Sequence, residues 1–145
     1  MKRIALLCFT ALWIKDRDKM KDCVNIDSQS FQLTLQVLRF DNDTQGLLHV
    51  DVISDMVSAK AEMDVSLKDY EKFVESIQEM HQNLCGEAVI AERYGDKQFL
   101  KFIMDKHTGH VYVKGELASR FNGHIQYVSI ENEFDQSSLN STSDV

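Results

Sequence analysis

Three histidines are the side chains in this sequence that come nearest to a metal site. His107 and His110 flank a tight turn and can converge on one ion, and His124 can approach them in space. A zinc site needs three or four ligands, and no further ligand stands at a recognisable spacing. We therefore interpret His107 and His110 as surface residues at a hairpin end and predict neither a metal nor a cofactor. The alternative is a small ligand-binding or metal-dependent enzyme that uses all three histidines and a cavity between helix and sheet.

Two further patterns resemble sites without completing them. The segment 41–46 begins like a calcium loop, but its twelfth position is Val52, which has no carboxylate to act as the bidentate ligand. His81 and Cys85 are spaced like a base and a nucleophile, yet a reactive thiolate also needs an oriented site. We interpret the first as an acidic turn and Cys85 as a small buried hydrophobe at a helix end. We predict no catalytic residues and no enzyme activity.

Acidic side chains are the better candidates for function, through partner binding. Three of them alternate along residues 131–135 and so share one face of a strand, while others gather between residues 41 and 55. The net charge is −7 and the pI is about 5.1, which argues against nonspecific nucleic-acid binding and suits a basic partner. The predicted partner-binding residues are Asp41, Asp43, Asp51, Asp55, Glu131, Glu133 and Asp135.

Strands are predicted wherever apolar and polar residues alternate. Asn122-Gly123, between the last two of these strands, is a strong hairpin signal. The short connections require antiparallel neighbours. The predicted strands are residues 31–37, 48–53, 57–65, 87–93, 97–106, 111–118 and 124–134.

One amphipathic helix is predicted after the third strand. Ser66 is a good N-cap, with Asp69 as an acidic variant of the capping box, and Gly86 stands where a left-handed C-terminal cap belongs. The apolar stripe of the helix is wide enough to dock it on a sheet. The predicted fold class is therefore α+β: one antiparallel sheet of about six or seven strands in meander order, with one helix packed on it.

A length of 145 residues predicts one domain, which we place at residues 23–136, with residues 137–145 as a disordered tail. Residues 1–22 start like a secretory signal but lack a small-x-small cleavage site. Their apolar run is too short to span a bilayer. We expect a non-native or disordered extension, with Met20 as a plausible start; a weak membrane anchor and an element packed on the domain are the alternatives. The three scattered cysteines predict free thiols and a cytoplasmic location.

Three segments of the chain carry a family resemblance: residues 65–73 (VSLKDYEKF) lead into the helix, residues 84–88 (LCGEA) leave it, and residues 129–139 (SIENEFDQSSL) close the last strand. Together they resemble the WapI-type bacterial immunity proteins. The resemblance spans about residues 30–139 and implies a small intracellular protein made beside a large polymorphic toxin. Such a protein binds the C-terminal toxin domain and blocks it, so it is an inhibitor and not an enzyme. The resemblance carries over no catalytic or contact residues.

Overall fold

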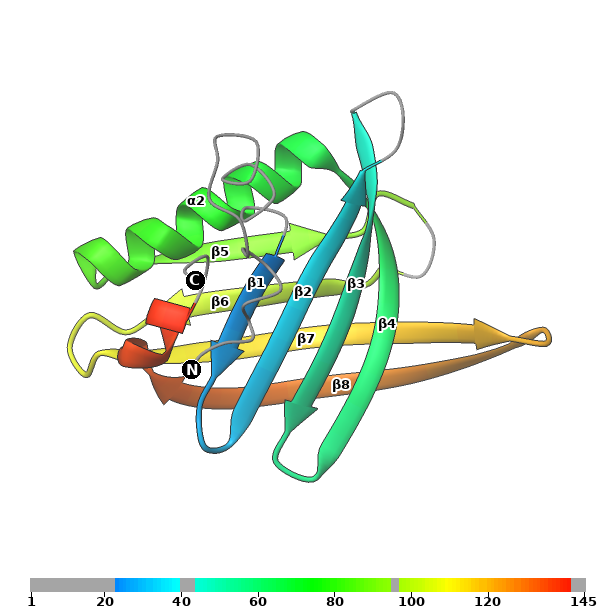
Figure 1. Ribbon diagram of the computed structural model, residues 1–145. Coiled ribbons are helices and arrows are strands. Elements are labelled where there is room, and N and C mark those ends of the chain that lie inside the picture. The colour runs from blue at the N-terminus through cyan, green and yellow to red at the C-terminus, as the bar shows by residue number, and fades with distance from the viewer. Residues whose placement is uncertain (1–22, 40–43, 95–96, 142–145) are drawn as a thin grey trace.

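The computed structural model describes residues 23–39, 44–94 and 97–141 of the chain (Figure 1). This part contains eight strands, one α-helix and one 3₁₀ helix. The strands are β1 (Cys23–Asp27), β2 (Phe31–Arg39), β3 (Gln45–Ser54), β4 (Val57–Ser66), β5 (Gly86–Ala91), β6 (Phe99–Met104), β7 (His110–Phe121) and β8 (His124–Asp135). The helix α2 (Leu67–Asn83) stands between β4 and β5, and the 3₁₀ helix η1 (Gln136–Ser141) follows β8.

The strands form two antiparallel sheets rather than one. Sheet 1 has the order β1-β2-β3-β4 and sheet 2 the order β5-β6-β7-β8, so each is a meander. The predicted α+β class and antiparallel pairing are confirmed, but the single sheet of six or seven strands is wrong. The chain leaves sheet 1 through α2, and β5 then pairs with β6 instead of returning to β4. The strands of sheet 1 cross those of sheet 2 at a steep angle (Figure 1).

The core lies between the two sheets and is built from the alternating apolar residues of both. Phe31 of β2 stacks on Phe134 of β8 with ring centroids 5.3 Å apart, and Phe102 of β6 lies edge-on to Phe134 at 6.5 Å. All three rings are buried. Because stacked and edge-to-face aromatic pairs add to the free energy of area burial, these contacts join the start of β2 in sheet 1 to the end of β8 in sheet 2.

The helix α2 follows its prediction at the start and departs from it at the end. The Ser66 side chain accepts a hydrogen bond from the backbone N–H of Asp69 at 3.4 Å. The apolar stripe is buried, and Phe73 contacts Phe102 of β6 with centroids 5.9 Å apart. The left-handed cap residue is Leu84 (φ 57°) instead of Gly86, and its N–H donates to the carbonyl oxygen of Met80. Gly86, the first residue of β5, also has positive φ, at 110°.

The C-terminal tail differs from the prediction, because residues 136–141 form η1 and Leu139 is fully buried. The cysteines differ as well: Cys23 is disulfide-bonded, and Cys85 is free but exposed rather than buried. The predictions for residues 1–22 concern a segment outside the described residues. Within residues 23–39, 44–94 and 97–141, no helix combines the length and the apolar character that a membrane span needs.

Candidate partner-binding face

The outer face of sheet 2 carries the acidic residues predicted at the end of the chain. Glu131, Glu133 and Asp135 are exposed on β8, while Ile130 and Phe134 between them point into the core. The strand register places Glu133 beside Tyr112 of β7, Tyr112 beside Ile103 of β6, and Ile103 beside Glu87 of β5. One row of side chains therefore crosses the whole sheet, with a carboxylate at each end and apolar surface between them.

Apolar side chains in the middle of this face are partly open to solvent. Val89, Ile103 and Tyr112 are 44%, 37% and 40% exposed. Carboxylates outnumber lysines around them: the acidic residues are Glu87, Glu116, Glu131, Glu133 and Asp135, and the lysines are Lys101 and Lys114. An apolar and aromatic centre with a charged surround is the usual anatomy of a protein–protein interface. We call this surface the acidic face.

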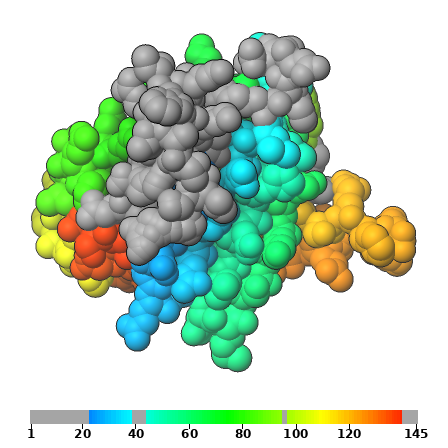
Figure 2. Space-filling model, in the orientation of Figure 1, coloured from blue at the N-terminus to red at the C-terminus, as the bar shows by residue number. Residues whose placement is uncertain are grey.

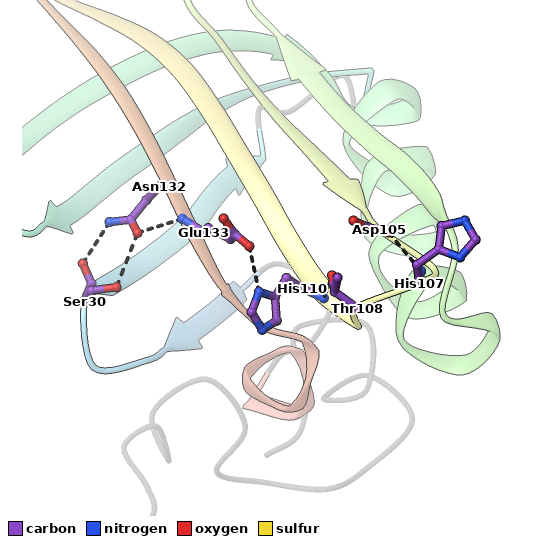
Figure 3. A network of polar contacts seen from close by, with 7 residues as sticks. All are labelled: Ser30, Asp105, His107, Thr108, His110, Asn132 and Glu133. Atoms are coloured by element: carbon purple, nitrogen blue, oxygen red, sulfur yellow. Dashed lines mark hydrogen bonds and ion pairs between the residues drawn. The ribbon is translucent and has the colours of Figure 1, made fainter.

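Hydrogen bonds hold two of the carboxylates in place on the acidic face. The Nδ1 atom of His110 lies 2.6 Å from Oε2 of Glu133 (Figure 3). The Tyr112 hydroxyl donates to Oε2 of Glu131, and this bond raises the pKa of Tyr112 above its usual value. Because both carboxylates are tied to side chains of β7, they lose little further freedom on meeting a partner.

Asp135 and Asp105 have a structural role at the same end of the sheet. The Asp135 carboxylate accepts the backbone N–H of Ser137 at 2.9 Å, and this bond lowers its pKa. The Asp105 carboxylate accepts the backbone N–H of His107 at 2.8 Å (Figure 3), which lowers the pKa of Asp105. A carboxylate that accepts backbone N–H groups is favoured in its charged form. Asp135 therefore fixes the start of η1 as well as adding charge to the acidic face.

Two other predicted acids, Asp51 and Asp55, do not join this face. Asp51 lies on the outer face of sheet 1, where its Oδ2 is 3.8 Å from Nζ of Lys60. Asp55 lies in the β3–β4 turn with φ 56°, and its N–H donates to the carbonyl oxygen of Ser30. Asp41 and Asp43 lie outside the described residues. The structure thus groups three of the seven predicted residues and separates Asp51 and Asp55 from them.

The three histidines are not brought together. His110 pairs with Asp135 in the β7–β8 register, and His124 stands eleven residues away along β8. At about 3.3 Å per residue this separation is roughly 36 Å. In the described part of the chain no group of three or more His, Cys, Asp and Glu side chains is placed to hold a metal ion. His81 and Cys85 form no hydrogen bond with each other, and the interface of α2 with sheet 2 is filled by buried side chains.

Gln98 is a buried polar residue that the sequence did not single out. It is 4% exposed, and its Nε2 donates to the carbonyl oxygen of Glu62 at 2.7 Å and to Oε2 of Glu92 at 3.1 Å. Its Oε1 accepts the backbone N–H of Ala118 at 2.9 Å. The side chain therefore joins the edge of β4 to β7, and we call this contact the Gln98 bridge.

Asn132 makes a second polar connection between the sheets. Its Nδ2 donates to the carbonyl oxygen of Ser30 at 3.0 Å and to Oγ of Ser54 at 2.9 Å. The Ser30 hydroxyl in turn donates to Oδ1 of Asn132 at 3.3 Å (Figure 3). Ser30 lies in the β1–β2 turn and Ser54 is the last residue of β3, so these bonds fix sheet 1 to the strand that carries the acidic face.

Comparisons of this chain with protein-family models, with curated proteins and with solved structures find no match. The resemblance to the WapI-type immunity proteins therefore stays a prediction. The support for a partner-binding role comes from the geometry of the acidic face alone.

Proposed function

We propose that this chain is a non-enzymatic immunity protein that binds and neutralises the C-terminal domain of a cognate polymorphic toxin. The observation that carries the proposal is the row Glu87, Ile103, Tyr112 and Glu133 across sheet 2. Its exposed apolar centre can be buried by a partner, and its carboxylates select a partner with a basic surface. The work of the protein is stoichiometric binding.

A nuclease toxin domain fits this surface best among basic partners. Such a domain needs cationic side chains to hold phosphates, and the acidic face presents carboxylates to the same side chains. Opposite fields steer association and fix the orientation of the two proteins. Tyr112 is the residue most suited to act as an anchor, because tyrosine is enriched among the residues that dominate binding energy.

Co-expression tests the proposal directly. The C-terminal domain of the large protein encoded beside this chain is expressed alone and then together with this chain. We expect growth arrest in the first case and rescue in the second, and the two purified proteins should form a complex of equal stoichiometry. A domain that is not toxic, or a toxic one that this chain neither binds nor neutralises, contradicts the proposal.

Charge reversal tests the acidic face. The variant carries Glu87→Lys, Glu131→Lys and Glu133→Lys; Asp135 is kept because its carboxylate accepts the Ser137 N–H. We expect association slower by at least about tenfold at low salt and a weaker dependence of the rate on salt. The matched control, Glu71→Lys, Glu75→Lys and Glu79→Lys, makes the same change in charge on the exposed side of α2. Equal effects of the two variants would leave only the net charge as the cause and refute a specific role for the acidic face.

We also propose a cytoplasmic location, since a toxin made in the same cell has to be blocked there. The disulfide bond of Cys23 in the structure is an observation against this location, because disulfides are rare in the cytosol. Cell fractionation, combined with alkylation of free thiols to determine the redox state of Cys23, tests this part of the proposal. Recovery of the protein outside the cytoplasm with Cys23 oxidised would contradict it.

A further inference from the structure

Two grooves meet where β4 crosses the β7–β8 hairpin. The larger, of about 910 Å³, lies between the outer face of sheet 1 and residues 118–120 of β7. The smaller, of about 560 Å³, lies between residues 58–60 of β4 and the residues of β7 and β8 that follow the crossing. Lys60, Ala118 and Ser119 line both grooves. Figure 2 shows the end of the hairpin standing clear of sheet 1 beside this crossing.

The edge of β4 beside these grooves carries unused backbone groups. β4 is an edge strand of sheet 1, and the carbonyl oxygens of Glu62 and Asp64 accept hydrogen bonds from outside that sheet, from Gln98 and Arg93. Because backbone direction repeats every second residue along a strand, the N–H and C=O groups of Ser58 and Lys60 also point away from β3. In the part of the chain that is described, no strand pairs with this edge.

The hydrophobic core is open at the same place. Ala59 of β4 and Val128 of β8 are packed against the core but only partly buried, and both line the smaller groove. Leu117, the partner of Val128 in the β7–β8 register, forms the floor beside them. An apolar side chain placed here from outside would continue the core, because Ala59 and Leu117 belong to the inward-facing rows of their strands.

The charged side chains that line the larger groove indicate which polar side chain of a partner would be attracted there. Each of its three carboxylates already has a contact: Glu62 with Nδ1 of His49 at 3.2 Å, Asp51 with Lys60 at 3.8 Å, and Glu92 with Gln98. Among the residues that the structure describes, the Lys60 ammonium is held only by this long contact to Asp51, and the Lys60 side chain is 82% exposed. A carboxylate beside Lys60 would therefore be attracted at this edge.

We propose that the free edge of β4 at Ser58 and Lys60 binds an extended segment of the partner toxin as an added strand. The segment places one apolar side chain over Ala59 and Val128 and an acidic side chain beside Lys60. Strand addition takes its affinity from main-chain hydrogen bonds and its specificity from pockets for alternate side chains, and both are present at this edge. The proposal rests on the proposed function and adds a second contact region to the acidic face.

Amide hydrogen exchange measured by NMR tests the added strand without any mutation. The labelled chain is studied alone and with a catalytically inactive toxin domain. We expect the Ser58 and Lys60 amides to exchange rapidly in the free protein and at least about a hundredfold more slowly in the complex. The Gly123 amide at the hairpin tip is the internal control and should stay fast. Binding of the toxin domain without protection at Ser58 and Lys60 would overturn the proposal while leaving the proposed function intact.

Two variants separate the backbone from the side chain. Ser58→Pro removes the outward N–H, which an edge strand tolerates, and should weaken binding by about tenfold or more; Ser58→Ala keeps the N–H and should bind as the wild type does. Lys60→Glu should also weaken binding, whereas Lys68→Glu on the exposed side of α2 should not. Urea unfolding of each variant shows whether it is folded. Unchanged affinity of folded Ser58→Pro would overturn the proposal.

A second copy of this chain is the competing occupant. In that case the Ser58 and Lys60 amides would be protected in the concentrated free protein and become exposed on dilution, and the proposal would be overturned. A toxin domain that fails to bind at all would remove the proposed function and this inference together, and the rescue assay reports that failure separately.

Discussion

Replacing Gln98 by alanine is the sharpest test of how the two sheets are held together. The substitution removes the hydrogen bonds to the Glu62 carbonyl, the Glu92 carboxylate and the Ala118 N–H. Each such bond contributes about 1 kcal/mol net, and a buried partner left unpaired costs about 1–3 kcal/mol. Because the larger groove borders Gln98, water can reach part of the gap. We expect the free energy of unfolding to fall by about 2–4 kcal/mol.

Urea unfolding at pH 7 measures this loss. With an m-value of about 2 kcal/mol per molar urea, the middle of the usual range, the midpoint should fall by about 1–2 M while the m-value stays unchanged. The matched control is Gln32→Ala, which removes the same side chain from an exposed position of β2 and should change stability by no more than about 0.5 kcal/mol. Exchange of the Ala118 amide should also become faster in the Gln98 variant than in the control variant.

Equal destabilisation by the two substitutions would refute the reasoning. The Gln98 bridge would then contribute nothing beyond the intrinsic cost of a glutamine-to-alanine change in a sheet protein. A lower m-value in the Gln98→Ala variant would instead show that the sheets separate in a partly folded state, which would place the effect of the bridge in cooperativity between the sheets.

Two further predictions concern the ends of the acidic face and the packing beneath it. Because the pKa of Asp135 is lowered in the folded chain by the Ser137 N–H, its carboxylate stabilises the fold above about pH 4, and that contribution is lost as the pH falls through the lowered pKa. The difference in urea midpoint between wild type and Asp135→Asn should therefore be largest near pH 7 and shrink below pH 4; a constant difference contradicts this. Gly115→Ala should cost about 1–3 kcal/mol in thermal unfolding, since its Cβ would lie 2.6 Å from Leu100 and 3.0 Å from the Phe99 carbonyl oxygen; an unchanged melting temperature contradicts it.

Local patterns in the sequence predicted the elements of the fold that depend on near neighbours. Alternation predicted seven of the strands, the Ser66 cap predicted the start of α2, and Asn122-Gly123 predicted the last hairpin, in which both residues adopt positive φ (53° and 80°). The strand β1 was not predicted, because it has only five residues. Within it only Val24 and Ile26 alternate with polar residues, and the buried Cys23 stands directly before Val24. Short alternating segments of this kind carry too little signal beside an atypical N-terminal stretch.

The division into two sheets could not be predicted from alternation, because alternation shows which side of a strand faces the core but not which sheet the strand joins. The decisive contacts are distant in sequence. Gln98 meets Glu62 and Ala118, 36 and 20 residues away, and Asn132 meets Ser30 at a separation of 102 residues. A glutamine at the start of a strand has no local feature that marks it as buried, so its role emerges only from the folded chain.

Only part of the acidic face could be predicted, because contacts between strands cannot be derived from the pattern of one strand. Glu131, Glu133 and Asp135 lie on one strand, so their common face follows from period two alone. Tyr112, Ile103 and Glu87 join them only through the register of sheet 2, which no single-strand pattern contains. The assignment of Asp51 and Asp55 to sheet 1 depends on the change of sheet at α2, which alternation does not show.

The positions of the two bridges bear on where a partner can bind. Gln98 closes the corner at which β4 meets β7, and Asn132 closes the side at which the turns of sheet 1 meet β8. Beyond Gln98, β4 and the hairpin diverge, and Ala59 and Val128 remain partly open to solvent. The Gln98 bridge thus marks the end of the closed core and the start of the free edge of β4 that an added strand would occupy. Since Val128 and Glu131 lie three residues apart on β8, roughly 10 Å, one partner can contact both regions, with basic side chains on the outer face of sheet 2 and an extended segment along the edge of β4.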